Sequence, residues 1–179
     1  EVMEITGQGT VNYDQLTGDA FYLVKTDYTE SLNKIWDLYK QKEYLTAAEE
    51  LGRLDLKDDS RVYKLRGDIY SALKKYKEAE DSYTTSIRLD SSAYVTFYNR
   101  GVMYANMQQN DKAIEDYTRT IKMDSTYVNA LNNRGLVYKE QGKYNLALED
   151  LNKVIRIISV QDAGLGVVVS KRKGKGFVY

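Results

Sequence analysis

The feature that most constrains this chain is an internal repeat with a period of about 34 residues. Three segments align without a gap, namely YKLRGDIY at 63–70, FYNRGVMY at 97–104 and LNNRGLVY at 131–138. Further positions downstream keep the same spacing, with alanine at the first and larger apolar residues at the others: Ala79, Ala113 and Ala147; Tyr83, Tyr117 and Leu151; Leu89, Met123 and Ile157. Because a fixed period of this length is the mark of repeat proteins, the sequence predicts similar units arranged in a row.

One period has the pattern of two helices. Apolar and small residues recur at helical spacing in each half, and a Lys-Lys pair at 74–75 separates the halves. The two stripes are Tyr63, Gly67, Tyr70 and Leu73, then Tyr76, Ala79, Tyr83 and Ile87. A lone two-helix unit cannot bury both stripes, so neighbouring units must stack to complete a core. The sequence therefore predicts an all-α solenoid of helical hairpins, with most of the repeated tyrosines in the core.

These residues resemble the tetratricopeptide repeat (TPR) family. The resemblance rests on the spacing aromatic-x-x-x-Gly-x-x-Tyr, followed by Ala and x-x-x-Tyr, within one period. It covers residues 60–159 as three repeats, at 60–93, 94–127 and 128–159. It implies an all-α fold, a right-handed superhelix (solenoid) of antiparallel helix pairs.

One position departs from the family pattern. TPR units often end in proline, and this chain contains none. Serine stands there instead, at Ser91, Ser125 and Ser159. We expect Asp90 and Asp124, each directly before one of these serines, to end and cap helices through side-chain hydrogen bonds.

The segments outside the three repeats differ from them. Residues 29–59 read as a degenerate helix pair that caps the array, with the apolar positions Leu32, Ile35, Trp36, Tyr39, Tyr44, Ala47, Ala48, Leu51 and Leu54. Terminal repeats are atypical because one of their faces meets water. We expect an irregular N-terminal segment at 1–28 and a Gly/Lys-rich tail at 160–179, irregular or with short strands, because glycines bound β-branched runs there.

Composition excludes most catalytic chemistry. The chain has no Cys, which excludes disulfides, thiolate zinc sites and a cysteine nucleophile, and no His, which removes the commonest general base and metal ligand. We therefore expect no enzyme activity, no catalytic residue, no metal site and no cofactor. Asp55, Asp58 and Asp59 lack the glycine and glutamate of a calcium loop and read as a solvated turn. Acidic residues on the second helices, Glu80 and Asp150 among them, are expected to be solvated.

Charge and hydropathy restrict the partners. Lys plus Arg equals Asp plus Glu, 26 against 26, so nucleic acid is not an expected partner. No stretch reaches the ~20 apolar residues that span a bilayer, so no membrane span is expected. A protein or peptide partner remains. The expectation leans to the cytoplasm, with the periplasm and secretion left open because a leader could have been removed.

The family resemblance also implies where a partner binds, because TPR first helices line a concave groove. The expected groove residues are Arg61, Lys64, Asp68, Tyr98, Asn99, Val102, Asn129, Asn132, Asn133, Leu136 and Lys139. We expect this groove to bind an extended peptide or a partner's helix. Amides of Asn99 and Asn133 would set the register, since an amide both donates and accepts. Tyr98 and Val102 would give apolar contact.

Two binding modes of the family can be compared with these positions. A carboxylate clamp grips a C-terminal carboxylate with Lys, Asn, Asn, Lys and Arg, where this chain has Lys64, Asp68, Asn99, Asn129 and Asn133. Asp68 would repel a carboxylate, so the clamp is disfavoured. In an asparagine ladder, one Asn of each repeat contacts the backbone of the ligand. Asn99 and Asn133 fit this mode better. Arg61 and Lys64 would then favour an acidic ligand end. The alternative that both amides serve only local structure stays open.

The C-terminal edge suggests a different role. The last second helix is rich in aliphatic residues: Leu146, Leu148, Leu151, Val154, Ile155, Ile157 and Ile158. Because such a face usually marks an interface, we expect it to be covered by residues 167–169 folding back, by a partner or by a second copy. The alternative functions are thus a structural assembly subunit that self-associates through this edge, or a helper domain of a larger enzyme.

Overall fold

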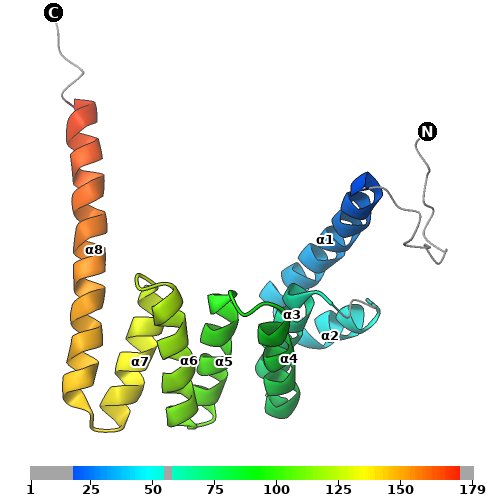
Figure 1. Ribbon diagram of the computed structural model, residues 1–179, viewed down its shortest axis with the longest axis horizontal. Helices are drawn as coiled ribbons and strands as arrows, with labels where there is room; N and C mark the ends of the chain where they lie inside the picture. The colour runs from blue at the N-terminus through cyan, green and yellow to red at the C-terminus, as the bar shows by residue number, and fades with distance from the viewer. Residues whose placement is uncertain (1–17, 55–57, 174–179) are drawn as a thin grey trace, which may run out of the picture. The chain divides into compact units, whose positions relative to one another are not determined.

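The computed structural model describes residues 18–54 and 58–173. In this part of the chain every regular element is a helix, as the all-α expectation requires (Figure 1). The helices are α1 (Gly18–Lys40), α2 (Tyr44–Gly52), α3 (Ser60–Ala72), α4 (Tyr76–Leu89), α5 (Tyr94–Asn106), α6 (Asn110–Met123), α7 (Val128–Glu140) and α8 (Tyr144–Lys173). They fall into two compact units, Glu1–Arg53 and Leu54–Tyr179.

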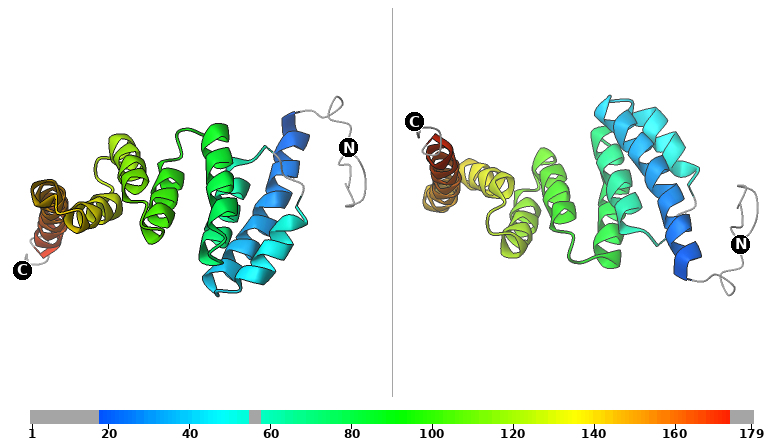
Figure 2. Two further views of the ribbon diagram at one scale, coloured as in Figure 1. Left: turned by 90° about the horizontal axis from the view of Figure 1, so that it is seen from below. Right: turned by 90° about the horizontal axis from the view of Figure 1, so that it is seen from above.

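The second unit is a solenoid of helix pairs, α3–α4, α5–α6 and α7–α8, which follow one another in chain order (Figure 2). Each second helix also contacts the first helix of the next pair, so α4 contacts α5 and α6 contacts α7. The first helices contact one another directly, α3 with α5 and α5 with α7. Among the described residues no second helix contacts another second helix. The first helices therefore form one continuous surface of the array.

The turn inside each pair is the same. Lys74, Gln108 and Gly142, which are one period apart, all have positive φ, between 59° and 73°. The next residue then donates its N–H back across the turn, as Lys75 does to the Tyr70 carbonyl at 2.8 Å. This left-handed C-terminal motif satisfies carbonyls that a helix end leaves open. Lys42, between α1 and α2, has the same conformation.

The turns between repeats form without proline, as predicted. Asp90 accepts hydrogen bonds from the backbone N–H and the hydroxyl of Ser92, at 2.9 and 2.6 Å. Asp124 does the same with Thr126, at 2.9 and 2.7 Å. These short-range bonds fix the chain as it leaves a second helix.

The core forms where the two helices of a repeat pack closely together, with a glycine of the first helix against a tyrosine of the second. A Cβ added to Gly67 would lie 2.6 Å from the Tyr83 ring, and one added to Gly101 would lie 2.9 Å from the Tyr117 ring. Both rings are buried, and they share one cluster with Ala79, Ala113, Ala130, Met103, Tyr104 and Val137. The predicted stripes therefore pack as expected, although Tyr144 is exposed instead of buried.

Two buried ion pairs tie the later repeats together. Arg134 donates from Nε and Nη2 to both oxygens of Asp150, at 2.8 and 2.7 Å, and from Nη1 to Thr118 at 2.9 Å. Arg100 repeats this pattern with Asp116 and Thr84. The expectation that Asp150 is solvated is wrong, because Arg134 compensates its charge in the interior.

In the first unit α1 packs against α2, with Leu32, Ile35, Ala47 and Leu51 buried. The expected helix pair is present, but α1 starts at Gly18, inside the segment predicted to be irregular. Residues 1–17 lie outside the described part. The chain has no proline to stop the helix, and extending a formed helix costs far less than starting one.

The C-terminal expectations need two corrections. Helix α8 continues to Lys173, where short strands or irregular chain had been expected in the segment 160–179, of which 174–179 is not described (Figure 1). Glycines in this stretch weaken a helix by only about 1 kcal/mol each, which does not break one already formed. In the single chain the aliphatic face of α8 is exposed, with Ile155 at 61% and Leu148 at 57%, and its covering by a partner or a second copy stays a prediction. Residues 167–169 belong to α8 and do not fold back on it.

Candidate functional site

The predicted binding residues all lie on α3, α5 and α7, and we call them together the first-helix surface. The structure leaves four of them exposed: Arg61, Asn129, Leu136 and Lys139. Six are half-buried: Lys64, Tyr98, Asn99, Val102, Asn132 and Asn133. One, Asp68, is buried. Because α5 contacts both α3 and α7, these side chains belong to one surface spanning three repeats.

Asp68 is part of the interior rather than of an open groove, which corrects the sequence prediction. Its carboxylate accepts hydrogen bonds from Lys64 Nζ at 2.7 Å, Tyr83 Oη at 2.8 Å and Asn99 Nδ2 at 2.7 Å. The side chain is only 4% exposed, while that of Lys64 is 26% exposed. A buried carboxylate requires such partners, and here they come from α3, α4 and α5. Asp68 therefore joins the first repeat to the second.

This arrangement also bears on the carboxylate clamp. Lys64 and Asn99 are the two residues that match the clamp, and Asp68 already holds both. Arg61 is likewise paired with a carboxylate, since its Nη2 lies 2.6 Å from Oδ2 of Asp59. The expected preference of Arg61 and Lys64 for an acidic ligand end therefore loses its physical basis.

An aromatic cluster covers the junction between the second and third repeats. The centroid of the Tyr98 ring lies 5.1 Å from that of Tyr127 and 6.0 Å from that of Tyr117. The rings of Tyr94 and Tyr127 meet edge to face, with their centroids 5.4 Å apart. Asn133 Nδ2 donates to the Tyr98 hydroxyl at 3.1 Å. Burial raises the pKa of Tyr98 and of Tyr117, while Asn133 acts against this shift in both. Tyr98 and Tyr117 are therefore neutral hydrogen-bonding groups near pH 7.

Asn99 and Asn133 occupy equivalent places in successive repeats. Each donates one amide hydrogen to a side chain of the preceding first helix, Asn99 to Asp68 and Asn133 to Tyr98. The Tyr117 hydroxyl also interacts with the Asn133 side chain. Hydrogen bonds within the protein thus orient both amides.

Comparison with known proteins identifies the fold. Models of the tetratricopeptide repeat match residues 60–92 and 128–158, and a TPR repeat model matches residues 103–142. The second TPR of Spaghetti (RPAP3), solved bound to the HSP90 peptide SRMEEVD, is 30% identical, with a TM-score of 0.53 over 56% of this chain and 94% of that one. The chain belongs to the tetratricopeptide repeat family. A search of curated proteins found no match.

Other solved TPR structures resemble the chain in fold. MamA is 21% identical, with a TM-score of 0.71 over 79% of this chain and 86% of that one. The TPR domain of Arabidopsis OM64 is 24% identical, with a TM-score of 0.52 over 55% of this chain and 81% of that one. At these identities the similarity shows a shared helical solenoid fold and nothing beyond it.

Sequence reasoning missed two features of this TPR array. Tyr94 and Tyr127 are part of the aromatic cluster but were not singled out. Arg100 and Asp116 form the same pair as Arg134 and Asp150. The signal was available, because the two pairs have the same internal spacing and are shifted by one period.

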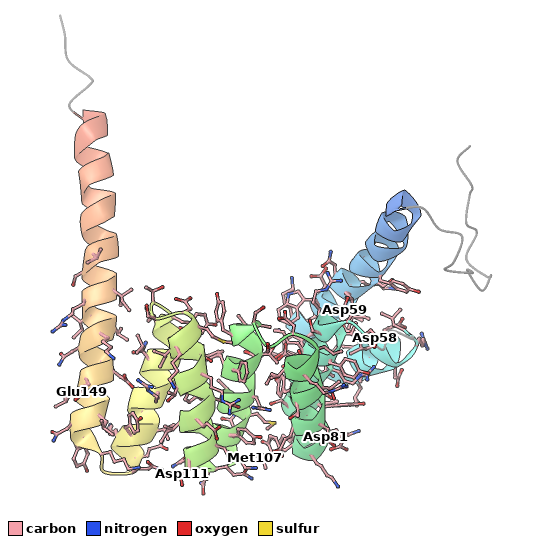
Figure 3. All side chains as sticks on the ribbon, in the orientation of Figure 1. Asp58, Asp59, Asp81, Met107, Asp111 and Glu149 are labelled. Carbon is pink, nitrogen blue, oxygen red and sulfur yellow. The ribbon has the colours of Figure 1, made fainter. Side chains whose placement is uncertain are left out.

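Asp58 and Asp59 directly precede α3. Asp59 caps α3 through the Arg61 N–H at 2.9 Å, next to the exposed Asp58 (Figure 3), and Asp55 lies outside the described residues. In the described ranges no group of three or more acidic residues gathers as a metal site would require. None of the helices described has the length and apolar character needed to cross a membrane.

Proposed function

We propose that this TPR protein binds an extended peptide, or a helix of a partner, across the first-helix surface. The family and the peptide-bound Spaghetti domain support a protein-interaction module. The observation that carries the finer proposal is the pair Asn99 and Asn133, one period apart and each fixed by a hydrogen bond to the preceding repeat. Their carbonyl oxygens would accept backbone N–H groups of the ligand, because an oriented amide loses little entropy on binding.

Apolar contacts would come from the second and third repeats. The position that holds the buried Asp68 in the first repeat holds Val102 in the second and Leu136 in the third. Leu136 is 53% exposed, and Val102 is half-buried against the core cluster. Together with the Tyr98 ring they offer an aliphatic and aromatic patch beside the two amides. The ligand is therefore expected to place one or two apolar side chains against α5 and α7.

The proposed ligand differs from the acidic peptide SRMEEVD found on Spaghetti. That peptide is rich in carboxylates, whereas Arg61 and Lys64 already pair with Asp59 and Asp68. An incoming carboxylate would have to displace a carboxylate that is covalently part of the protein. We therefore propose a ligand recognised by its backbone and apolar side chains.

The test starts from a displayed library of random peptides selected on the 179-residue chain. The enriched peptide is then synthesised with a fluorophore, and its affinity is measured by anisotropy for wild type, Leu136→Ala and Asn133→Ala. Each variant should weaken binding by about tenfold, as loss of a central contact does. The matched control is Leu45→Ala, an exposed leucine on α2, which should bind like wild type. Equal affinity for Leu136→Ala and wild type, at an unchanged melting temperature, would exclude this surface.

A further inference from the structure

Helix α8 exposes apolar residues at positions that are covered in the second helix of the preceding repeat. Leu148 and Ile155 are 57% and 61% exposed. One period earlier, Ile114 and Ile121 on α6 hold these positions, and both are half-buried and pack against a core cluster that includes residues of α7. Helix α7 contacts α6 directly, and α8 is the last helix that the structure describes (Figure 1). The open side of α8 is therefore the side on which a first helix packs in the repeat before it.

A polar position on the same side of the second helices has a matching pattern. Arg100 Nη1 on α5 donates to the Thr84 hydroxyl on α4 at 3.0 Å, and Arg134 Nη1 on α7 donates to the Thr118 hydroxyl on α6 at 2.9 Å. Each of these first helices thus places an arginine on the second helix before it. The equivalent residue of α8 is Asn152, which is exposed and whose side-chain carbonyl can accept the same hydrogen bond. Three residues, spaced by four and then three positions, therefore form one side of α8 that we call the docking face: Leu148, Asn152 and Ile155.

The described part of this chain does not itself cover the docking face. Asp90 and Asp124 fix the turns after α4 and α6 through hydrogen bonds to residues two positions later. After another period Ile158 holds this position, and its side chain accepts no hydrogen bond. Helix α8 accordingly continues to Lys173 without a turn. As far as Lys173, the chain therefore supplies no helix that packs on α8 as α7 packs on α6.

A second copy of the chain offers no suitable first helix within the described residues. In three first helices, the position that packs on the preceding second helix is 0% exposed and hence already occupied: Val62, Thr96 and Ala130. The Thr96 hydroxyl, for example, lies 3.5 Å from that of Ser86 on α4. When the first unit is aligned with the first repeat through Ala47 and Ala79, this position of α1 holds Glu30, which is exposed. A glutamate on an aliphatic surface would lose hydration without gaining a partner, so the occupant is a different protein.

We propose that the docking face binds an amphipathic helix of another protein, which packs on α8 as α7 packs on α6. An arginine of that helix donates to Asn152 Oδ1. The array also indicates the neighbour of this arginine, because Tyr104, four residues after Arg100, reaches Glu80 on α4, at the position equivalent to Leu148. The partner helix therefore carries an arginine followed four residues later by an aromatic or apolar residue. This proposal does not depend on the first-helix surface.

A peptide with the α7 sequence is the probe, because α7 covers the equivalent side of α6. A fluorescent peptide of residues 128–141 is held helical by a hydrocarbon staple in place of Asn132 and Leu136, which belong to the first-helix surface. Its affinity for the full chain is measured by anisotropy. Ile155→Glu should weaken binding by about tenfold or more, because a charge then lies in the apolar contact. The control is Leu45→Glu on α2, at a leucine 65% exposed, which should bind like wild type.

A double-mutant cycle tests the predicted arginine. Arg134→Ala in the peptide and Asn152→Ala in the protein should each weaken binding about fivefold, as loss of one hydrogen bond does. The two changes together should cost no more than one alone, because both remove the same bond. Additive losses, no binding of the peptide, or equal binding to wild type and Ile155→Glu would each overturn the proposal.

Sedimentation equilibrium separates a partner protein from a second copy. Wild type should remain monomeric as its concentration rises, and so should Ile155→Glu. The circular dichroism of Ile155→Glu should match that of wild type, because the isoleucine is exposed. A wild-type dimer that Ile155→Glu converts to monomers would show that a second copy occupies the docking face, which overturns the proposal.

Discussion

Asp68 on α3 accepts a hydrogen bond from Asn99 on α5, 31 residues away in the chain, at 2.7 Å. The same buried carboxylate binds the Tyr83 hydroxyl and Lys64 Nζ. One side chain thus links both helices of the first repeat to the second repeat. It also occupies the two side chains that would otherwise suit a ligand's carboxylate.

Replacing this carboxylate should therefore destabilise the array. In Asp68→Ala the Tyr83 hydroxyl loses its buried acceptor and Lys64 loses its counter-ion, and we expect a loss of about 2–3 kcal/mol in the free energy of unfolding. Urea denaturation followed by circular dichroism measures it. The control is Asp81→Ala on the exposed side of α4 (Figure 3), expected within about 0.5 kcal/mol of wild type. Similar losses for the two variants would contradict the role assigned to Asp68.

The three equivalent glycines should respond differently to alanine. In Gly67→Ala the new Cβ would lie 2.6 Å from the buried Tyr83 ring, so we expect a net loss of about 2 kcal/mol from overpacking. In Gly135→Ala the nearest atom is 3.5 Å away, because Leu151 replaces the tyrosine, and the better helix propensity should raise stability by about 0.5–1 kcal/mol. Thermal unfolding of the two variants gives the comparison. Equal destabilisation by Gly67→Ala and Gly135→Ala would show that the closeness of the facing side chain does not determine the effect of the added Cβ.

The sequence predicted the helix pairs of the three repeats because each pair repeats a complete apolar pattern. It also predicted the close approach at Gly67, since a small residue faces a tyrosine one helix later. It could not predict that Asp68 is buried. The helical period shows on which side of α3 a residue lies, but not how far the neighbouring helices cover it. The clue was Tyr83, whose buried hydroxyl requires an acceptor. The sequence could not tell what covers the apolar face of α8, because an apolar stripe does not show whether this chain or another molecule packs on it.

Glycine should stabilise the turn inside the first repeat and the turn inside the second. Lys74 and Gln108 hold φ near +60°, a conformation that costs most residues about 1 kcal/mol and that glycine adopts freely. We therefore expect Gln108→Gly to raise stability by about 0.5–1 kcal/mol. The reverse change, Gly142→Ala, should lower it by about 1 kcal/mol, because Gly142 has φ +73° and open space around it. Melting temperatures that move the same way in both variants would refute this account of the turn.

Stability should fall in acid partly through Glu80. The Tyr104 hydroxyl donates to its carboxylate at 2.6 Å and Lys112 at 3.3 Å, and these contacts hold the pKa of Glu80 below its usual value. A carboxylate with a depressed pKa in the folded state stabilises the protein above its unfolded pKa, about 4.3, and this contribution is lost as pH falls through the lower folded value. The destabilisation by Tyr104→Phe should therefore be larger at neutral pH than in acid. Urea titrations at both pH values measure it, and a constant difference would rule out the link to Glu80.

Replacing only one partner of the buried ion pair Arg134–Asp150 should strongly lower the free energy of unfolding. Asp150→Ala leaves the Arg134 guanidinium, whose side chain is 12% exposed, without its carboxylate, and we expect a loss of about 3–5 kcal/mol. Glu149→Ala, at the exposed neighbouring position on α8 (Figure 3), is the control and should change stability little. Replacing both partners by apolar residues, Arg134→Met with Asp150→Leu, should recover most of the loss, because no uncompensated charge then remains in the interior. The four proteins form a set measured by urea denaturation. If the double variant were as unstable as Asp150→Ala, the cost would come from packing at this junction and not from the unpaired charge.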